Sequence, residues 1–170
     1  RAALRTQLIK KKIFNINEVL YSHMHADQTH GINDLRIFFL KQKKMIDVYA
    51  DTSTSKYLKS NFSYCFENKK DYPQILKLNT IKKGLTFKDK KDKINIQSIT
   101  VKHGNVKCLS FVVNNKLAYA SDVSHIYKKD YKKFKNLKYL VIDCLRFTKH
   151  PAHFNYDEVM NIVHKLKPAK

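Results

Sequence analysis

The segment Ser22-His23-Met24-His25-Ala26-Asp27-Gln28-Thr29-His30-Gly31 places three histidines and a carboxylate within ten residues. It directly follows the apolar run 19–21, which predicts a short buried strand. The histidines are therefore expected on a loop at a strand end. Alternate side chains of extended backbone point the same way, so His23 and His25 can offer imidazole nitrogens to one metal ion. Asp27 can reach a second ion alongside.

Two further candidate ligands follow strands later in the chain. His103 comes just after the predicted strand 94–101, and Asp122 comes just after the predicted strand 117–120. Strand ends meet at one edge of a sheet, where separate loops can build a site together. The sequence therefore predicts a metal site with these ligands: His23, His25, Asp27, His103 and Asp122.

These motifs resemble those of a known family. The run HMHADQTHGINDLR resembles the HxHxDH signature of metallo-β-lactamase-fold hydrolases, in a subgroup similar to phosphoribosyl cyclic phosphodiesterases. The resemblance extends over nearly the whole chain. His103-Gly104 matches the separate metal-binding His-Gly, Ser121-Asp122-Val123 matches the bridging-aspartate motif, and residues 151–155 resemble the PxHxx segment before the last helix.

The resemblance implies a four-layer αβ/βα sandwich, which belongs to the α/β class, with two divalent metal ions, zinc or manganese. One ion would be held by His23, His25 and His103. The other would be held by Asp27, which also counts as a catalytic residue, and by the bridging Asp122.

The implied reaction is hydrolysis of a small cyclic or activated phosphodiester. Two ions roughly 3.5–4 Å apart lower the pKa of a bridging water and neutralise charge on the phosphoryl oxygens. His153 would be a catalytic histidine that protonates the leaving oxygen or holds the phosphate. Arg146 and His150 lie in the loop before it and are candidates for binding the anionic substrate.

The chain departs from the family pattern in two ways. Gln28 stands where the general motif has a histidine ligand, and a neutral amide is a poorer donor to zinc or manganese, so the second site is weakened unless His30 or a water substitutes. The family's usual first strands and its last strand, with the final histidine ligand, find no match. We therefore expect a chain truncated at both ends, whose exposed sheet edge favours pairing with another chain, as in a homodimer.

The formal charge of +20 suggests acidic partners, but only four of the 34 basic residues are arginine. This excess of lysine is typical of a compositional bias spread over the whole surface, so we expect no specific nucleic-acid surface. No apolar run approaches the ~18 residues of a transmembrane helix, and residues 1–13 lack the features of a signal peptide. These features predict a cytoplasmic protein without a membrane partner.

Few glycines and prolines punctuate the chain, so residues 1–170 are expected to form a single domain. Three widely spaced cysteines predict reduced thiols, with Cys108 and Cys144 in the core. A helix is predicted from Ile32 and another around 55–62, with a strand at 46–50 between them. Antiparallel strands are predicted at 85–87 and 94–101, and a hairpin at 109–120 turning at Asn114-Asn115. A buried strand at 139–142 and a helix at 156–166, capped by Asn155, complete the prediction.

Two other classes of function stay open. A nuclease of the transfer-RNA 3′-processing type has a similar set of motifs and would suit the positive charge, but no long Gly-rich extension resembling its RNA-gripping arm is present. A folded remnant that binds metal poorly and catalyses nothing is the other alternative. Metal content and activity on a chromogenic phosphodiester separate the three.

Overall fold

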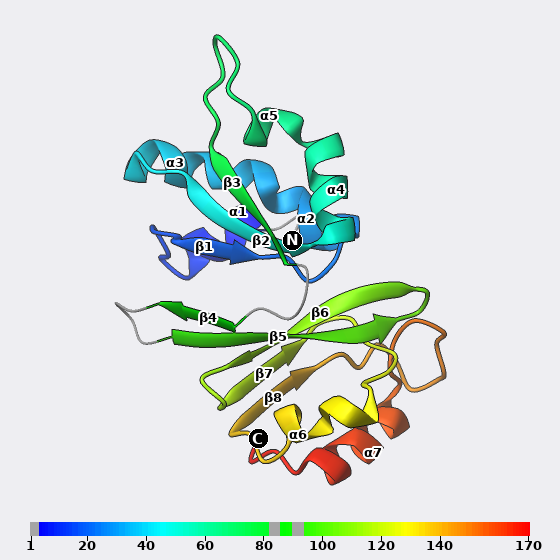
Figure 1. Cartoon of the computed structure of the whole chain (residues 1–170). Coiled ribbons are helices and arrows are strands. Elements are labelled where there is room, and N and C mark those ends of the chain that lie inside the picture. Colours follow the sequence, from blue (N-terminus) through cyan, green and yellow to red (C-terminus); the bar gives the residue numbers. More distant parts are fainter. Residues whose placement is uncertain (1–3, 82–85, 90–93) are drawn as a thin grey trace. The chain divides into compact units, whose positions relative to one another are not determined.

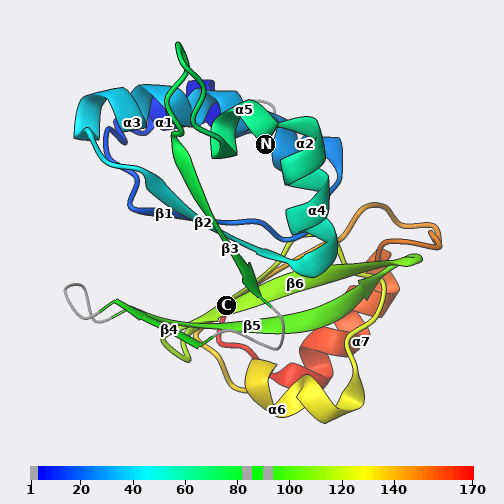
Figure 2. The same cartoon turned by 45° about the horizontal axis from the view of Figure 1, so that its top comes forward.

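The computed structural model describes residues 4–81, 86–89 and 94–170. The chain divides into two compact units, Arg1–Lys82 (unit 1) and Lys83–Lys170 (unit 2). Each unit has its own sheet and its own buried core (Figures 1 and 2). The two units are therefore described one at a time.

Unit 1 contains a parallel sheet in the order β1 (Glu18–Leu20), β2 (Ile46–Asp51) and β3 (Leu76–Ile81). Helical segments connect these strands: α1 (Leu4–Lys10), α2 (Ala26–Thr29), the 3-10 helix η1 (His30–Leu35), α3 (Arg36–Gln42), α4 (Thr52–Asn61) and α5 (Ser63–Phe66). The predicted strand at 46–50 and the helix near 55–62 are confirmed. The predicted helix from Ile32 is present but begins as a 3-10 helix, and β3 was not predicted.

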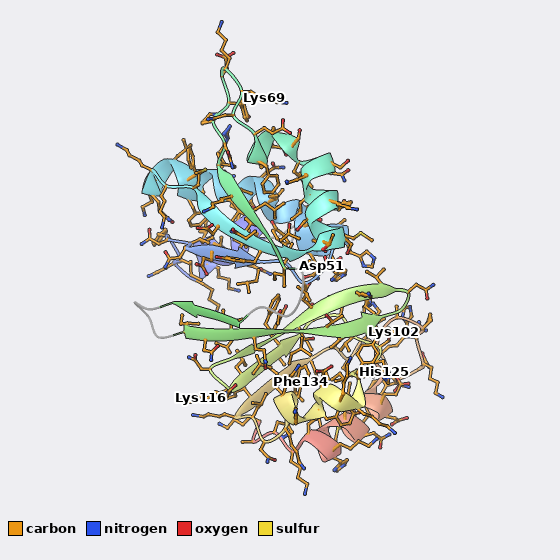
Figure 3. The ribbon with its side chains drawn as sticks, viewed as in Figure 1. Asp51, Lys69, Lys102, Lys116, His125 and Phe134 are labelled. Carbon is orange, nitrogen blue, oxygen red and sulfur yellow. The ribbon has the colours of Figure 1, made fainter. Side chains whose placement is uncertain are left out.

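The core of unit 1 forms where β2 meets the η1–α3 segment. Ile46, Val48 and Ala50 alternate along β2 as fully buried residues, because successive side chains of a strand point to opposite faces. Ile32 and Leu35 of η1 belong to the same apolar cluster. At the end of β2, the carboxylate of Asp51 accepts a hydrogen bond from the Thr54 backbone N–H at 2.8 Å and so starts α4 (Figure 3). This packing fixes the segment that follows β1, where the histidine motif lies.

Unit 2 contains a five-stranded sheet in the order β4 (Thr86–Asp89), β5 (Ile94–His103), β6 (Val106–Val113), β7 (Leu117–Ala120) and β8 (Tyr139–Ile142). Strands β4 to β7 are antiparallel, and β8 runs parallel to β7. Three helical segments complete the unit: η2 (Lys128–Asp130), α6 (Tyr131–Phe134) and α7 (Tyr156–Leu166). Leu85, predicted in the first of these strands, lies outside the described residues.

Apolar residues of α6 and α7 cover one face of this sheet. Phe134 of α6 is fully buried (Figure 3), and Ile162 and Leu166 of α7 pack in the same cluster as Val101 of β5 and Ala118 of β7. The α/β class with two sheets is therefore confirmed. No helix among the described residues is long and apolar enough to cross a membrane.

The turn and cap chemistry of unit 2 follows the sequence closely. Asn114 and Asn115 have φ angles of 52° and 51°, the left-handed conformation that asparagine tolerates in a hairpin turn. Asn155 accepts a hydrogen bond from the Glu158 N–H at 2.9 Å, while the Glu158 carboxylate accepts one from the Asn155 N–H at 3.0 Å. This capping box fixes the start of α7, directly after His153.

Two predictions about burial in unit 2 are wrong. Strand β8 was expected to be buried, but Tyr139 and Val141 are 39% and 48% exposed. The reason is that β8 is the edge strand of its sheet and presents these alternate residues away from the helices. Cys144 was expected in the core and is exposed, because it lies two residues past the end of β8, whereas Cys108 within β6 is buried as expected.

The Asn155 cap makes a prediction about stability. Asn155→Ala should lower the free energy of unfolding by about 1 kcal/mol. The reason is that the hydrogen bond from the Glu158 N–H is lost with the Asn155 side chain, and the reciprocal bond to the Glu158 carboxylate is weakened. Urea unfolding followed by circular dichroism measures the change. Lys165→Ala on the exposed face of α7 is the control and should alter stability by less than about 0.5 kcal/mol. Equal stability of the Asn155 variant and the wild type would contradict the capping role.

Candidate metal and catalytic site

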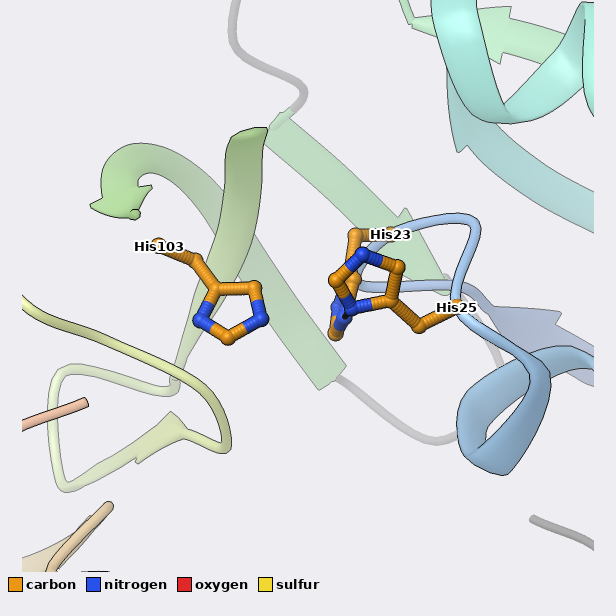
Figure 4. A group of neighbouring side chains, drawn as sticks. All are labelled: His23, His25 and His103. Carbon is orange, nitrogen blue, oxygen red and sulfur yellow. Dashed lines mark hydrogen bonds between the residues drawn. The ribbon is translucent and has the colours of Figure 1, made fainter. Parts of the chain in front are cut away.

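In unit 1, the histidine pair of the motif follows β1. His23 is fully buried, and its Nδ1 lies 3.1 Å from the Ser22 hydroxyl. Its Nε2 lies 2.9 Å from Nδ1 of His25, and the two rings meet edge to face with centroids 4.5 Å apart (Figure 4). The two nitrogens therefore face each other across a hydrogen bond.

The spacing of this pair fits two ligands of one ion. Zinc–nitrogen bonds of 2.0–2.1 Å in a tetrahedral site put two ligand nitrogens about 3.3 Å apart. The 2.9 Å between His23 Nε2 and His25 Nδ1 needs only a few tenths of an ångström of opening to reach that value. A divalent cation would also replace a hydrogen bond in which one imidazole must donate to the other.

The next residues of the motif divide into different roles. Asp27 lies in the first turn of α2, and the Gln28 amide donates a hydrogen bond to its carboxylate. Gln28 thus orients a candidate ligand, whether or not it contacts metal itself. His30 lies elsewhere: its Nε2 is 3.4 Å from the Tyr57 hydroxyl, and its ring packs edge to face on Phe62. His30 therefore does not join the His23–His25 pair.

In unit 2, His103 ends β5 and is buried (Figure 4). Its Nδ1 lies 2.7 Å from the carbonyl oxygen of Ala152, so Nδ1 carries the proton and donates. The lone pair of the neutral ring is therefore on Nε2. A backbone carbonyl behind one ring nitrogen is the arrangement that orients a metal-binding histidine.

Asp122 follows β7 and lies close to His103. Its Oδ2 is buried and has no hydrogen-bond partner among the described residues. Ligand atoms of His103, Asp122 and His153 all lie within 4.8 Å of one another. A buried carboxylate oxygen without a partner is costly, and a cation is the partner that best satisfies it. The donor set of unit 2 therefore fits a divalent metal ion.

His153 is held by a carboxylate that the sequence interpretation missed. Its Nδ1 lies 2.5 Å from Oδ2 of Asp143, and the same oxygen accepts a hydrogen bond from the Val123 N–H at 3.2 Å. The His153 ring also meets the His103 ring edge to face, with centroids 4.6 Å apart. Asp143 directly follows β8, so the strand-end argument that selected Asp122 could have selected Asp143 as well.

The two predicted substrate-binding residues are placed differently. The Arg146 guanidinium donates hydrogen bonds to the carbonyls of Thr148 and Lys149 at 3.2 and 2.7 Å, so it shapes its own loop. His150 packs against His153 with ring centroids 5.1 Å apart. Desolvation lowers the pKa of His150, and the positive charge of Arg146 lowers it further. Thus His150 lies beside His153, whereas the Arg146 guanidinium is directed toward the loop backbone.

Comparison with known proteins identifies the family and the fold of this chain. The family described as "Beta-lactamase superfamily domain" matches residues 2–170, so the chain belongs to that family. A crystal structure described as a new diphosphatase from the PhnP family is 24% identical, with a TM-score of 0.82 over 98% of this chain and 62% of that one. The metallo-β-lactamase fold protein YhfI from Bacillus subtilis is 16% identical, with a TM-score of 0.74 over 98% of this chain and 67% of that one. The expected fold family is thereby confirmed.

A curated relative is much longer than this chain. A protein of Porphyromonas gingivalis (strain ATCC BAA-308 / W83) named octanoyltransferase is 24% identical over 165 residues, which are 95% of this chain and 32% of that protein. The chain thus spans about a third of the curated relative that it matches. That name describes the whole of the longer protein.

The position of His103 depends on the glycine after it. Gly104 has a φ of +57°, and a Cβ on it would lie 2.9 Å from the Cβ of Ala152. Gly104→Ala should lower the free energy of unfolding by about 1–2 kcal/mol, from left-handed strain alone, and should weaken metal binding by moving Ala152 away from His103. Chemical unfolding and metal titration measure the two effects. Asn105→Ala, an exposed change in the same turn, is the control, and equal behaviour of both variants would contradict the role of Gly104.

Proposed function

We propose that this protein is a divalent metal-dependent hydrolase that cleaves a small cyclic or activated phosphodiester. Its family membership and the diphosphatase among its structural neighbours support a hydrolase. The observation that carries the finer proposal is in unit 2, where the buried, unpartnered Oδ2 of Asp122 lies beside two histidines, His103 and His153. Such a group suits a cation and a phosphoryl substrate together.

The proposed ligands come from both histidine-carboxylate groups, and zinc or manganese would suit them: His23, His25, Asp27, His103 and Asp122. We propose two ions per chain, of which the second is weaker because Gln28 contributes an amide where the family motif has a histidine. When bound, a divalent metal acidifies a coordinated water and neutralises charge on phosphoryl oxygens.

The chain's own residues would then orient donors and move a proton. Gln28 orients the Asp27 carboxylate, and the Ala152 carbonyl orients His103. His153 in its imidazolium form would give the Nε2 proton to the leaving oxygen as the phosphorus–oxygen bond breaks, while the attacking water releases a proton to solvent and its oxygen bonds to phosphorus. Asp143, against Nδ1, stabilises the imidazolium before the transfer.

A non-catalytic remnant and an octanoyltransferase are weaker proposals on the same observations. A remnant of the fold would have no need for a buried carboxylate oxygen without a partner, because an unpartnered polar group lowers stability. The octanoyltransferase named above matches over only 32% of its length, which gives no ground for assigning its activity to this chain.

Metal content tests the ligand assignment. The double variant His23→Ala/His25→Ala and the single variant His103→Ala should each lose bound metal, since each removes nitrogen ligands. Elemental analysis of purified protein, expressed as metal per chain, measures the loss. His164→Ala, on the exposed surface of α7, should keep the wild-type ratio. An unchanged ratio in the double variant would overturn the assignment.

Activity combined with metal content tests His153. His153→Ala should keep the bound metal while turnover of a chromogenic phosphodiester falls about 10²–10⁴-fold, the range for loss of a general acid or base. Asp143→Asn should keep the metal as well and lower turnover less, because an amide can still orient the ring but cannot balance its charge. Loss of metal together with activity in His153→Ala would make that residue a ligand instead.

A further inference from the structure

Two hollows in unit 2 share one aromatic side chain. The first, about 580 Å³, begins at His153 and is also lined by Lys102, His125 and Tyr127. The second, about 340 Å³, is lined by Tyr127, Lys107 and Lys129. Tyr127 therefore forms part of the wall of both hollows, and lysines line both of them. We call the two adjoining hollows the cationic groove and define it by six residues: Lys102, Lys107, His125, Tyr127, Lys129 and His150.

Backbone pairing holds the groove together. The Lys102 N–H donates to the His125 carbonyl at 2.9 Å, in a short antiparallel bridge that places the two side chains together (Figure 3). Tyr127 packs edge to face against His125 with ring centroids 5.3 Å apart, and the Lys129 ammonium lies 5.6 Å from the Tyr127 centroid. Tyr127 is still 37% exposed. An exposed ring flanked by cations is the platform on which a nucleic-acid base stacks.

The charge of the groove is not cancelled from within. Two carboxylates line the hollows, and both are engaged: Glu158 in the capping box of α7, and Asp130 with Lys133 at 2.7 Å. Within the described part of the chain, Lys102, Lys107 and Lys129 have no carboxylate within ion-pair distance. The ammonium groups of these three lysines therefore present positive charge to a molecule that binds in the groove.

We propose that the cationic groove binds a short single-stranded oligonucleotide, with phosphates on the lysines and a base on Tyr127, and leads one phosphodiester to His153. Lysine is a point-charge donor without the bidentate geometry that reads a base edge, so this binding is independent of sequence. It departs from the expectation, drawn from the sequence, that the lysines are spread over the whole surface and form no specific nucleic-acid surface. The inference rests on the proposed function for cleavage and extends its substrates from a small cyclic or activated phosphodiester to a linear one, but the binding itself does not depend on catalysis.

A single phosphodiester would leave most of this groove unused. A small cyclic diester at His153 occupies only the first hollow, whereas Lys107 and Lys129 line the second. Several connected phosphates and a flat base can use both hollows, because successive phosphates repeat along the strand while every base offers a face for stacking. The substrate that uses the whole groove is therefore linear.

Fluorescence anisotropy of a labelled six-nucleotide single-stranded RNA, with EDTA present, tests the binding apart from catalysis. The variant Lys102→Gln/Lys107→Gln/Lys129→Gln should bind at least about tenfold more weakly near physiological salt. The slope of log affinity against log salt should fall by about 2, since each lysine–phosphate contact contributes about 0.7. Tyr127→Leu, which keeps an apolar side chain, should weaken binding about fivefold or more.

The matched control removes three exposed lysines of unit 2 outside the groove: Lys116→Gln/Lys135→Gln/Lys165→Gln. Figure 3 shows Lys116 at the opposite end of the sheet from Lys102 and His125. This variant should lose less than about threefold in affinity. Equal weakening by the two triple variants would overturn the proposal and assign the binding to general surface charge. No effect of Tyr127→Leu would overturn the base-stacking part of it.

A parallel assay of the wild-type chain with metal separates this inference from the proposed function. If the chain cleaves bis(p-nitrophenyl) phosphate but its RNA binding is not weakened by the groove variant, the groove proposal is wrong and the phosphodiesterase proposal is supported. If the groove variant weakens RNA binding but neither the chromogenic diester nor the RNA is cleaved, the groove proposal is supported and the phosphodiesterase proposal is wrong. Cleavage of the RNA that falls with the groove variant and not with the control would support both.

Discussion

The hydrogen bond from His103 Nδ1 to the Ala152 carbonyl is the contact on which the candidate site of unit 2 depends. It joins the end of β5 to the loop that carries His153, although these segments are 49 residues apart in sequence. The contact requires close approach of two backbones, and Gly104 permits that approach because any Cβ there would meet Ala152. This bond thereby fixes the proton on Nδ1 of His103 and ties β5 to the loop that carries His153, the proposed proton donor.

Near that contact the structure leaves Oδ2 of Asp122 without a hydrogen-bond partner in the described part of the chain, and likewise the hydroxyl oxygen of the neighbouring Ser121. Most buried polar atoms of a folded protein find partners, and the fold supplies them nearby: Asp143 has His153 and Val123, and Asn155 has Glu158. Asp122 Oδ2 has none among the described residues. Local rules of stability are broken most often at functional sites, where a ligand completes what the chain leaves open. The unfavourable free energy of burying this carboxylate oxygen without a partner is explained if a cation binds at the site.

How much the sequence could predict depended on the kind of information each feature carries. Local chemistry was readable: the Asn114-Asn115 turn, the Asn155 cap and the strand before His23 all lie where their residues indicate. Strand-end placement correctly brought His103 and Asp122 together within unit 2. Joining the motifs into one family needed the resemblance, because spacing alone does not say which strand ends are neighbours.

Other features depended on tertiary contacts that the sequence does not display. Strand β8 reads as buried from its apolar residues, yet its edge position leaves half of them exposed. The anion-binding role of Arg146 stays a prediction, and the structure adds that its guanidinium donates hydrogen bonds to two carbonyls of its own loop. The lysines are evenly spread along the sequence, whereas in the structure Lys102 lines one hollow and Lys107 and Lys129 line another that shares Tyr127 with it. The sequence does not display the bridge between Lys102 and His125 that pairs β5 with the segment after β7.

The most direct test of the metal site is the unfolding free energy of the wild type and of Asp122→Asn, measured with EDTA and with zinc. In EDTA the variant should be at least as stable as the wild type, because a neutral amide replaces a buried carboxylate that lacks a partner. With zinc at about 100 times its dissociation constant, the wild type should gain about 2.7 kcal/mol and the variant far less. An equal gain from zinc in both proteins would contradict the assignment of Asp122 as a ligand.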